Sequence, residues 1–224
     1  MTGGTQYKAV LFDLDGTLLN TIDDLADAMN AALAACGFSA HTAEECKYFV
    51  GDGVRNFALR SLPPDRRDEA TLGRIIPFYR DAYSRNWDNK TRPYEGVPEL
   101  LDALAARGLK LIVYSNKPDE FTNLTVQKIL PKWEFSAIVG ARESWPNKPD
   151  PSASLDILGK LGLDPAEVLY IGDTGTDMQT AIAAGMFAVG ALWGFRTAKE
   201  LLENGAKVLI KKPTDLLTLI GQQP

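Results

Sequence analysis

Two carboxylates, separated by one residue, follow a short apolar run near the start of the chain. The run is Ala9 to Phe12, and Asp13 and Asp15 come directly after it. Clustered carboxylates repel one another unless one is protonated or a cation neutralises them. Hard cations such as Mg²⁺ take oxygen ligands and often bind one or two carboxylates together with phosphate oxygens. The pair therefore indicates a Mg²⁺ and phosphate site, although an acidic pair in a surface loop has the same spacing.

Five later side chains have chemistry that would suit the same site. Ser115 and Asn116 can donate hydrogen bonds to a phosphate oxygen without adding charge, and the Lys148 ammonium can neutralise a phosphate or a carboxylate nucleophile. Asp173 and Asp177 repeat the opening pattern of an apolar run, an aspartate, a turn and a second aspartate. Each residue alone also suits a helix cap, a helix N-terminus or a solvated loop. Capping is a poor explanation for all of them together, since each group follows a predicted strand or turn.

Short apolar runs alternate with amphipathic helical segments over most of the chain. A run without polar alternation is typical of a strand buried on both faces, and repeated strand–helix alternation predicts a parallel sheet covered by helices. In such sheets ligands bind at the carboxyl ends of the strands, where these side chains would emerge. The predicted strands are Ala9–Phe12, Leu109–Tyr114, Phe135–Gly140, Val168–Ile171, Phe187–Ala191 and Val208–Ile210.

The segment between Leu18 and Arg92 has helical spacing throughout and no strand candidate of any strength. The predicted helices are 21–36, 42–49, 54–61 and 65–87, the last interrupted near Pro77. We therefore predict an α/β fold: a Rossmann-like parallel sheet core with helices on both faces, formed by residues 1–20 and 93–224. An all-α cap domain, residues 21–92, is inserted after the first strand.

The composition is that of an ordinary globular chain. It has 224 residues, of which 45% are hydrophobic and 24% charged, and its net charge of −5 does not favour nucleic acid or an anionic membrane. No apolar run is long enough to span a bilayer, and the N-terminal segment lacks the apolar core of a signal peptide. Two cysteines make no disulfide framework, so we expect a cytoplasmic protein. The single histidine, His41, lies in a polar turn and cannot alone form a zinc site.

Taken together, the motifs resemble those of the haloacid dehalogenase superfamily. Four segments match in order, and nearly the whole chain is covered: Asp13-Leu-Asp15-Gly-Thr17, Ser115-Asn116, Lys148-Pro, and Gly172-Asp173-x-x-x-Asp177. Within the superfamily the chain is most similar to the phosphoglycolate phosphatase branch. Further matching pieces are Tyr94-Glu-Gly-Val97, Thr180-Ala-x-x-Ala-Gly185 and Leu192-Trp-Gly-Phe195.

The resemblance implies a role for each carboxylate. Asp13 would be the nucleophile that forms an aspartyl-phosphate, and Asp15 the general acid and then the general base. The dehalogenases of the superfamily lack an acid at the place of Asp15, so the chain resembles a phosphotransferase. Mg²⁺ would be held by Asp13, the backbone carbonyl of Asp15, and Asp173, with Asp177 in support.

The phosphate-binding groups follow from the same resemblance. Ser115 and Asn116 would hold the phosphoryl oxygens, and Lys148 would offset negative charge. Phosphoryl transfer depends mainly on positioning and charge neutralisation, so this inventory is adequate for the chemistry.

The inserted helices would form the mobile cap of the family, which closes over the site and selects the substrate. The candidate specificity loop is Gly51-Asp52-Gly53, with Arg55 nearby, although Gly-Asp-Gly is also an ordinary tight turn. Asp52 departs from what a carboxylated substrate needs, because it would repel that substrate if it pointed inward. Asp52 therefore argues against phosphoglycolate as the substrate but not against phosphatase activity.

The leading hypothesis is a Mg²⁺-dependent phosphatase acting on a small phosphorylated metabolite, phosphoglycolate first. Three alternatives stay open: a sugar-phosphate phosphomutase, a phosphonatase that would need a cap lysine such as Lys47, and a non-enzymatic interaction protein. No nucleic acid or membrane partner is expected, and the sequence leaves monomer and homodimer open.

Overall fold

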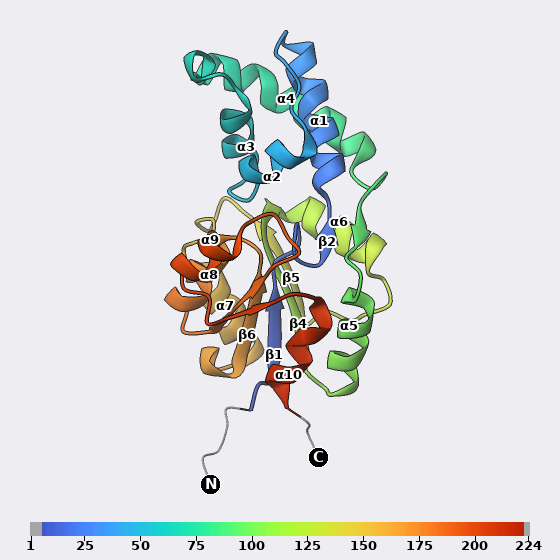
Figure 1. The fold of residues 1–224 in the computed structure, drawn as a ribbon, viewed down its shortest axis with the longest axis vertical. Helices are drawn as coiled ribbons and strands as arrows, with labels where there is room; N and C mark the ends of the chain where they lie inside the picture. Colours follow the sequence, from blue (N-terminus) through green and yellow to red (C-terminus); the bar gives the residue numbers. More distant parts are fainter. Residues whose placement is uncertain (1–5, 222–224) are drawn as a thin grey trace.

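The structure is a computed structural model and describes residues 6–221 of the chain. The first five residues of the N-terminal segment considered above lie outside the described residues. The centre is a six-stranded sheet with the strand order β5-β4-β1-β6-β7-β8, and all neighbouring strands are parallel (Figure 1). The strands are β1 (Ala9–Phe12), β4 (Lys110–Pro118), β5 (Ala137–Ala141), β6 (Val168–Gly172), β7 (Phe187–Ala191) and β8 (Val208–Ile210).

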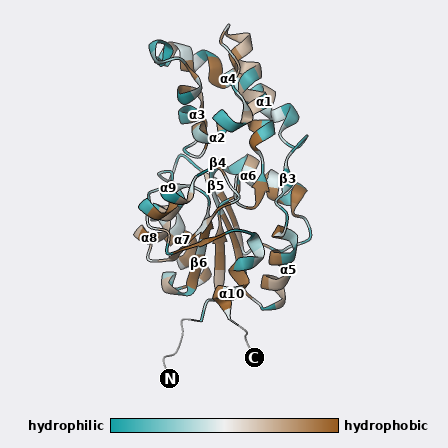
Figure 2. Cartoon of the chain, in the orientation of Figure 1, coloured by the Kyte–Doolittle hydropathy of each residue, from teal (hydrophilic) through white to brown (hydrophobic). Residues whose placement is uncertain are grey.

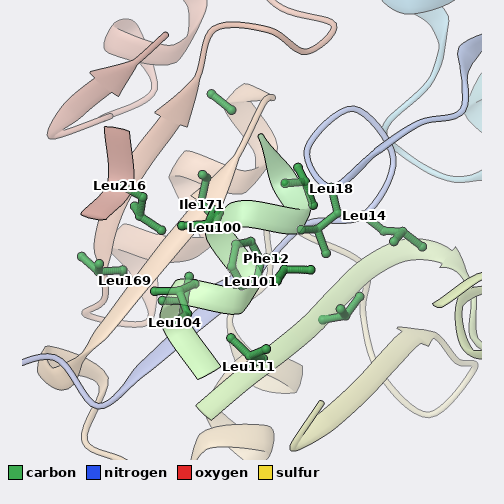
Figure 3. Packing of buried hydrophobic residues seen from close by; sticks show 14 of the residues in the cluster. Phe12, Leu14, Leu18, Leu100, Leu101, Leu104, Leu111, Leu169, Ile171 and Leu216 are labelled. Atoms are coloured by element: carbon green, nitrogen blue, oxygen red, sulfur yellow. The ribbon is translucent and has the colours of Figure 1, made fainter. Parts of the chain in front are cut away.

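Strand β1 lies in the middle of the sheet and is buried on both faces, as its apolar run predicts. Val10 and Phe12 pack on one face, while Ala9 and Leu11 pack on the other, since successive side chains of a strand alternate. Figure 3 shows Phe12 among leucines of the helix that covers the first face. Burying each large side chain contributes about 1.5–3 kcal/mol, so the central strand is held firmly in place.

Helices cover both faces of the sheet, which confirms the expected α/β architecture. In Figure 2 the strands are strongly apolar, whereas the surrounding helices also carry hydrophilic positions. The core helices are α5 (Val97–Ala106), α6 (Asp119–Ile129), α7 (Ser152–Leu161), α8 (Gly175–Ala183), α9 (Ala198–Glu203) and α10 (Leu217–Ile220). None of the helices within residues 6–221 is long and apolar enough to cross a bilayer.

Four consecutive helices form a separate layer above the carboxyl ends of the strands (Figure 1). We call this layer the cap. Its helices share a hydrophobic cluster, in which α1 packs along α4 and which Phe195 of the core joins. Its helices are α1 (Ile22–Ala35), α2 (Ala43–Phe49), α3 (Val54–Ser61) and α4 (Glu69–Asn86). The cap places apolar and polar side chains over the edge of the sheet where ligands are expected.

Two short strands flank the cap, and the sequence did not predict them as a pair. Strand β2 (Leu19–Asn20) pairs antiparallel with β3 (Arg92–Pro93). Each strand has only two residues, which is too short for an apolar periodicity to show. The pairing brings the two connections between core and cap side by side.

Helix α4 differs from the expected helix in its start and in its continuity. It begins after Asp68, whose side chain accepts a 2.8 Å hydrogen bond from the backbone N–H of Thr71. Residues 64–66 form a separate 3₁₀ turn. The expected interruption at Pro77 is wrong, because α4 continues through this residue. Pro77 and Gly73, four residues earlier, are exposed, so water can replace the missing backbone donor.

Candidate active site

Asp13 and Asp173 directly follow the ends of two neighbouring strands. Asp13 follows β1 and Asp173 follows β6, and these strands are parallel and paired, so both carboxylates emerge at the same edge. Ser115, Asn116 and Lys117 lie in the last part of β4, the strand on the other side of β1. The topology therefore brings residues more than a hundred positions apart to one place.

The ammonium of Lys148 lies between two carboxylates. Its Nζ is 2.7 Å from Oδ1 of Asp13 and 2.6 Å from Oδ1 of Asp177, and it donates to the carbonyl of Tyr114 at 3.2 Å. The hydroxyl of Tyr170 donates to the same Asp177 oxygen at 3.0 Å. Burial lowers the pKa of Lys148, but the two carboxylates outweigh burial and hold this pKa well above its ordinary value. The Lys148 side chain is therefore a fixed positive charge.

Asp173 completes a cluster of three buried acids. One carboxylate oxygen from each of Asp13, Asp173 and Asp177 lies within 4.8 Å of the other two. Asp173 is held from two sides: the Thr17 hydroxyl donates to Oδ1 at 3.0 Å, and the backbone N–H of Phe195 donates to Oδ2 at 2.7 Å. These bonds fix the orientation of the Asp173 carboxylate before any ligand binds.

The cluster carries more negative charge than Lys148 can balance. Burial raises the pKa of Asp13 well above its usual range, and burial together with the Asp177 charge raises the pKa of Asp173 to about 7. Ionisation of both Asp13 and Asp173 is therefore costly here without a cation. An all-oxygen donor set of this kind suits Mg²⁺, so the residues present fit the metal that the resemblance implies.

Two glycines leave room for these acids. A Cβ at Gly194 would lie 2.2 Å from Cβ of Asp173, and a Cβ at Gly172 would lie 2.3 Å from Cβ of Asp177. Real Cβ atoms do not approach so closely, so neither position accepts a side chain without displacing an aspartate. The spacing of the acids depends on glycine at both places.

Asp15 has a different partner, Lys117, which the sequence motifs did not assign to the site. The Nζ of Lys117 lies 3.0 and 3.2 Å from the two carboxylate oxygens of Asp15, and it donates to the hydroxyl of Tyr83 at 2.5 Å. Tyr83 belongs to α4 of the cap, whereas Lys117 and Asp15 belong to the core. A chain of polar contacts thus runs from the expected acid/base residue to the cap.

Ser115 and Asn116 line the same cavity, and both already have partners. The Ser115 hydroxyl accepts from the backbone N–H of Lys117 at 3.2 Å. The Asn116 side chain accepts from the backbone N–H of Lys148 at 2.9 Å and donates to the carbonyl of Gly51 at 3.0 Å. Asn116 therefore fixes the Lys148 backbone and contacts the cap loop.

The cap loop reaches the core through its backbone and through Asp52. Gly51 and Gly53 line the cavity, but Asp52 is not among the residues that line it. One Asp52 oxygen accepts from the Thr176 hydroxyl at 3.0 Å, and the other pairs with Arg60. The repulsion of a carboxylated substrate considered above does not arise, because Asp52 is occupied by these contacts.

Two other cap residues named from the sequence lie away from the cavity. Arg55 pairs with Glu69 on the cap surface, and its side chain is 54% exposed. Lys47, the residue that a phosphonatase would need, pairs with Glu44 at 2.6 Å. Neither Arg55 nor Lys47 is among the residues that line the cavity.

Arg196 of the core binds backbone carbonyls of the cap just before this loop. Its guanidinium donates to the backbone carbonyl of Lys47 and, at 2.8 Å, to the backbone carbonyl of Val50. Arg196 directly follows Phe195, which holds Asp173. No sequence motif indicated Arg196. Its acceptors are backbone carbonyls, which every residue has, so no residue type marks them.

Core and cap enclose a cavity of about 520 Å³. Its floor is polar and includes Asp13, Asp15, Ser115 and Lys148, while cap side chains form much of its wall. A volume of this size is typical of small-molecule sites. The carboxylates of Asp13 and Asp15 and the lysines Lys117 and Lys148 thus belong to residues that line one cavity, and the cluster of buried acids lies beside it.

Comparison with known proteins identifies the family. A family model described as haloacid dehalogenase-like hydrolase matches residues 10–191. The chain is 33% identical to a phosphoglycolate phosphatase of Nitrosospira multiformis, over 95% of both chains, and 30% identical to one of Aquifex aeolicus, over 95% and 96%. The solved structure of a predicted phosphoglycolate phosphatase from Haemophilus somnus has a TM-score of 0.89 and 28% identity, and the match covers 98% of this chain and 100% of that one. The chain belongs to the haloacid dehalogenase-like hydrolases.

Proposed function

We propose that this protein is a Mg²⁺-dependent phosphatase that hydrolyses a small phosphomonoester through an aspartyl-phosphate on Asp13. One observation supports the proposal most directly: Asp13 lies 2.7 Å from the Lys148 ammonium, within a cluster of acids that suits a cation. A phosphatase acting on small phosphate esters agrees with the family and with the relatives.

The chain's own residues account for both halves of the reaction. A carboxylate oxygen of Asp13 attacks phosphorus, the bond from phosphorus to the ester oxygen breaks, and Asp15 gives its proton to the leaving alkoxide. Asp15 then takes a proton from water, whose oxygen attacks phosphorus and releases Asp13 and inorganic phosphate. Lys148 is a fixed positive charge beside the nucleophile and limits repulsion between Asp13 and the phosphoryl group.

Asp13, Asp173 and the backbone carbonyl of Asp15 would hold Mg²⁺. Asp177, whose oxygens accept from Lys148, Tyr170 and Thr174, would support the site. The bound cation would neutralise charge that develops on the phosphoryl oxygens. Thr17 and the N–H of Phe195 keep Asp173 oriented for this role.

Phosphoglycolate is the first substrate to test, because relatives at 30–33% identity over nearly the whole chain carry that activity in their names. The free thiols Cys36 and Cys46 agree with a reducing compartment, and we propose the cytoplasm.

Release of inorganic phosphate from phosphoglycolate and from an aryl phosphate tests the proposal. We expect activity that requires Mg²⁺ and falls by about 10³-fold or more in Asp13→Asn. Asp102→Asn, which changes a surface aspartate paired with Lys132, is the matched control and should keep wild-type activity. Absence of Mg²⁺-dependent phosphate release from any ester by the wild type would refute the proposal.

A further inference from the structure

The two carboxylate oxygens of Asp173 are held by different parts of the molecule. Oδ1 accepts from the hydroxyl of Thr17, in the loop after β1, whereas Oδ2 accepts from the backbone N–H of Phe195, in the loop after β7. We call residues 193–196 of that second loop the linking segment. The orientation of the Asp173 carboxylate therefore depends on where the linking segment lies.

The linking segment is attached to the core at one end and to the cap at the other. At its start, the indole N–H of Trp193 donates to the backbone carbonyl of Thr17 at 3.0 Å. At its end, the ring of Phe195 is buried in the hydrophobic cluster of the cap, and the Arg196 guanidinium donates to two backbone carbonyls of the cap. The N–H that holds Asp173 lies between these attachments.

Arg196 binds the end of a cap helix. Its two acceptors, the carbonyls of Lys47 and Val50, belong to the last turn of α2 and to the residue that follows the helix. The last carbonyls of a helix have no partner within it and carry partial negative charge. One planar guanidinium can donate to both carbonyls at once, and the Arg196 side chain is only 8% exposed. Arg196 can make this contact only while the cap is docked on the core.

The linking segment packs closely against the acid that it orients. A Cβ at Gly194 would lie 2.2 Å from Cβ of Asp173 and 2.5 Å from the backbone carbonyl of Gly16. The backbone of the segment therefore lies directly against Asp173, and packed protein interiors transmit such displacements. A shift of the segment must move the Asp173 carboxylate or break its hydrogen bond with the N–H of Phe195.

We propose that Arg196 is a positioning residue, which couples docking of the cap to the orientation of Asp173 and thereby strengthens binding of Mg²⁺. With the cap docked, Arg196 and the Phe195 ring hold the linking segment, and the N–H of Phe195 orients Asp173. When the cap leaves the core, the segment loses both of its cap attachments. By linkage, bound Mg²⁺ favours the docked cap by the same factor. The inference rests on the cation site of the proposed function.

The charge of Arg196 would by itself act in the opposite direction. A guanidinium repels a divalent cation, so removing an arginine that acted only through its charge would strengthen Mg²⁺ binding. Removing a positioning contact weakens binding instead, because a metal ligand without its supporting contacts binds less tightly. The direction of the change in Mg²⁺ affinity therefore separates the two explanations.

Calorimetric titration with Mg²⁺ alone, without substrate, measures this affinity. We expect Arg196→Met to raise the dissociation constant by about 3- to 10-fold, less than for loss of a direct supporting partner, because Arg196 acts through Phe195. Arg107→Met is the matched control: its guanidinium also donates to a backbone carbonyl, that of Ala103 at 3.0 Å. Arg107 lies before the first residue of β4, at the opposite edge of the sheet, so Arg107→Met should keep the dissociation constant within about twofold of wild type.

Hydrogen exchange of the Phe195 amide, measured by NMR in EDTA, is a second readout that requires neither metal nor activity. Arg196→Met should speed this exchange by about 3- to 10-fold relative to the amides of β1, which exchange through global opening and so report overall stability. Asp52→Ala removes a different cap contact, that with Thr176, and should speed exchange of the Phe195 amide in the same direction.

Arg196→Lys is a second variant, which decides the matter if Arg196→Met folds poorly. It keeps the charge but lacks the planar fork that reaches both carbonyls, so it should show at least half of the loss of Mg²⁺ affinity on a logarithmic scale. Wild-type affinity in Arg196→Lys, or unchanged or tighter binding in Arg196→Met, would overturn the proposal.

The exchange measurement can also overturn it. A Phe195 amide that Arg196→Met affects no more than the amides of β1 would exclude a positioning role, and one that Asp52→Ala leaves unchanged would exclude coupling to the cap. Failure of the wild type to bind Mg²⁺ would instead refute the proposed cation site, and the coupling with it.

Discussion

The Thr176 hydroxyl of the core donates a 3.0 Å hydrogen bond to the Asp52 carboxylate of the cap. Thr176 immediately precedes Asp177, one of the three clustered acids, so this contact joins the cap loop to the segment that carries the expected cation site. The described structure therefore has the cap in contact with the site it covers.

Asp52→Ala should weaken closure of the cap over the site. The substitution removes the acceptor for Thr176 and the partner of Arg60, and a lost hydrogen bond of this kind corresponds to about a 3- to 10-fold rise in KM. Asp65→Ala, on an exposed turn of the cap, and Arg55→Ala should leave KM within about twofold of wild type. Steady-state kinetics with phosphoglycolate measures all three. A larger effect of Arg55→Ala than of Asp52→Ala would contradict the assignment of closure to Asp52.

Lys148→Met should destabilise the protein as well as abolish activity. Removing this ammonium leaves Asp13 and Asp177 buried without a positive partner, which costs about 3–5 kcal/mol of unfolding free energy. Lys160→Met makes the same change in an exposed helical pair with Asp156 and should cost no more than about 0.5 kcal/mol. Urea denaturation without Mg²⁺ at neutral pH measures the difference. Equal losses in the two variants would show that Lys148 does not stabilise the acid cluster.

Without Mg²⁺, the protein should lose stability as the pH rises from about 4 to about 7. The folded state raises the pKa of Asp173 from 3.8 to about 7, chiefly by burial, so in this window the folded chain binds more protons than the unfolded chain. Unfolding free energy then falls with rising pH, and the contribution of the group is lost once pH passes its folded pKa. Asp13, whose pKa is raised in the same direction, adds to the trend.

Denaturant titrations at pH 5 and pH 8, with EDTA or with Mg²⁺, test this expectation. Mg²⁺ should stabilise the protein more at pH 8, where the carboxylates are ionised, than at pH 5. Asp173→Asn should flatten the pH dependence measured in EDTA. A metal-free protein whose stability rises between these two pH values would contradict the expectation.

Gly194→Ala should impair the expected cation site although it replaces none of the proposed ligands. The added methyl would lie 2.2 Å from Cβ of Asp173 and 2.5 Å from its Oδ2, so the carboxylate must move. Changes that displace a metal ligand from its supporting contacts typically cost about 10- to 100-fold in metal affinity. Gly159→Ala, in α7 with no atom within 4 Å of the added methyl, should leave the Mg²⁺ dependence unchanged. The concentration of Mg²⁺ that gives half-maximal activity reports both results.

The sequence was sufficient for the core of the fold, because burial of a parallel strand leaves a short apolar run between helical segments. The six strands of the sheet occur where such runs predict them, although β4 continues past Tyr114 to Pro118. Strands β2 and β3 were missed because a two-residue pair has no period. The break expected at Pro77 does not occur, since an exposed helix position tolerates proline.

For the site, sequence reasoning found residues whose side-chain type signals chemistry, and the structure brings most of them to one cavity. Asp173 is buried beside Asp13 and Asp177, whereas Asp52 and Arg55 do not line the cavity. Sequence reasoning overlooked the contact of Lys117 with Tyr83, because a contact between core and cap exists only in the folded chain. Arg196 was also overlooked, since it binds main-chain carbonyls. Asp52 looked like an obstacle to a carboxylated substrate only because the directions of side chains in a loop cannot be read from residue types.

Because β2 pairs with β3, the two segments that connect core and cap leave the core at neighbouring points. We therefore expect that an entire cap can be exchanged at these two connections while the sheet keeps its register. Such a graft would exchange Tyr83 and the Gly51 loop but retain Asp13, Asp15 and Lys148. Exchange of caps by recombination would let one hydrolase core acquire new substrate preferences.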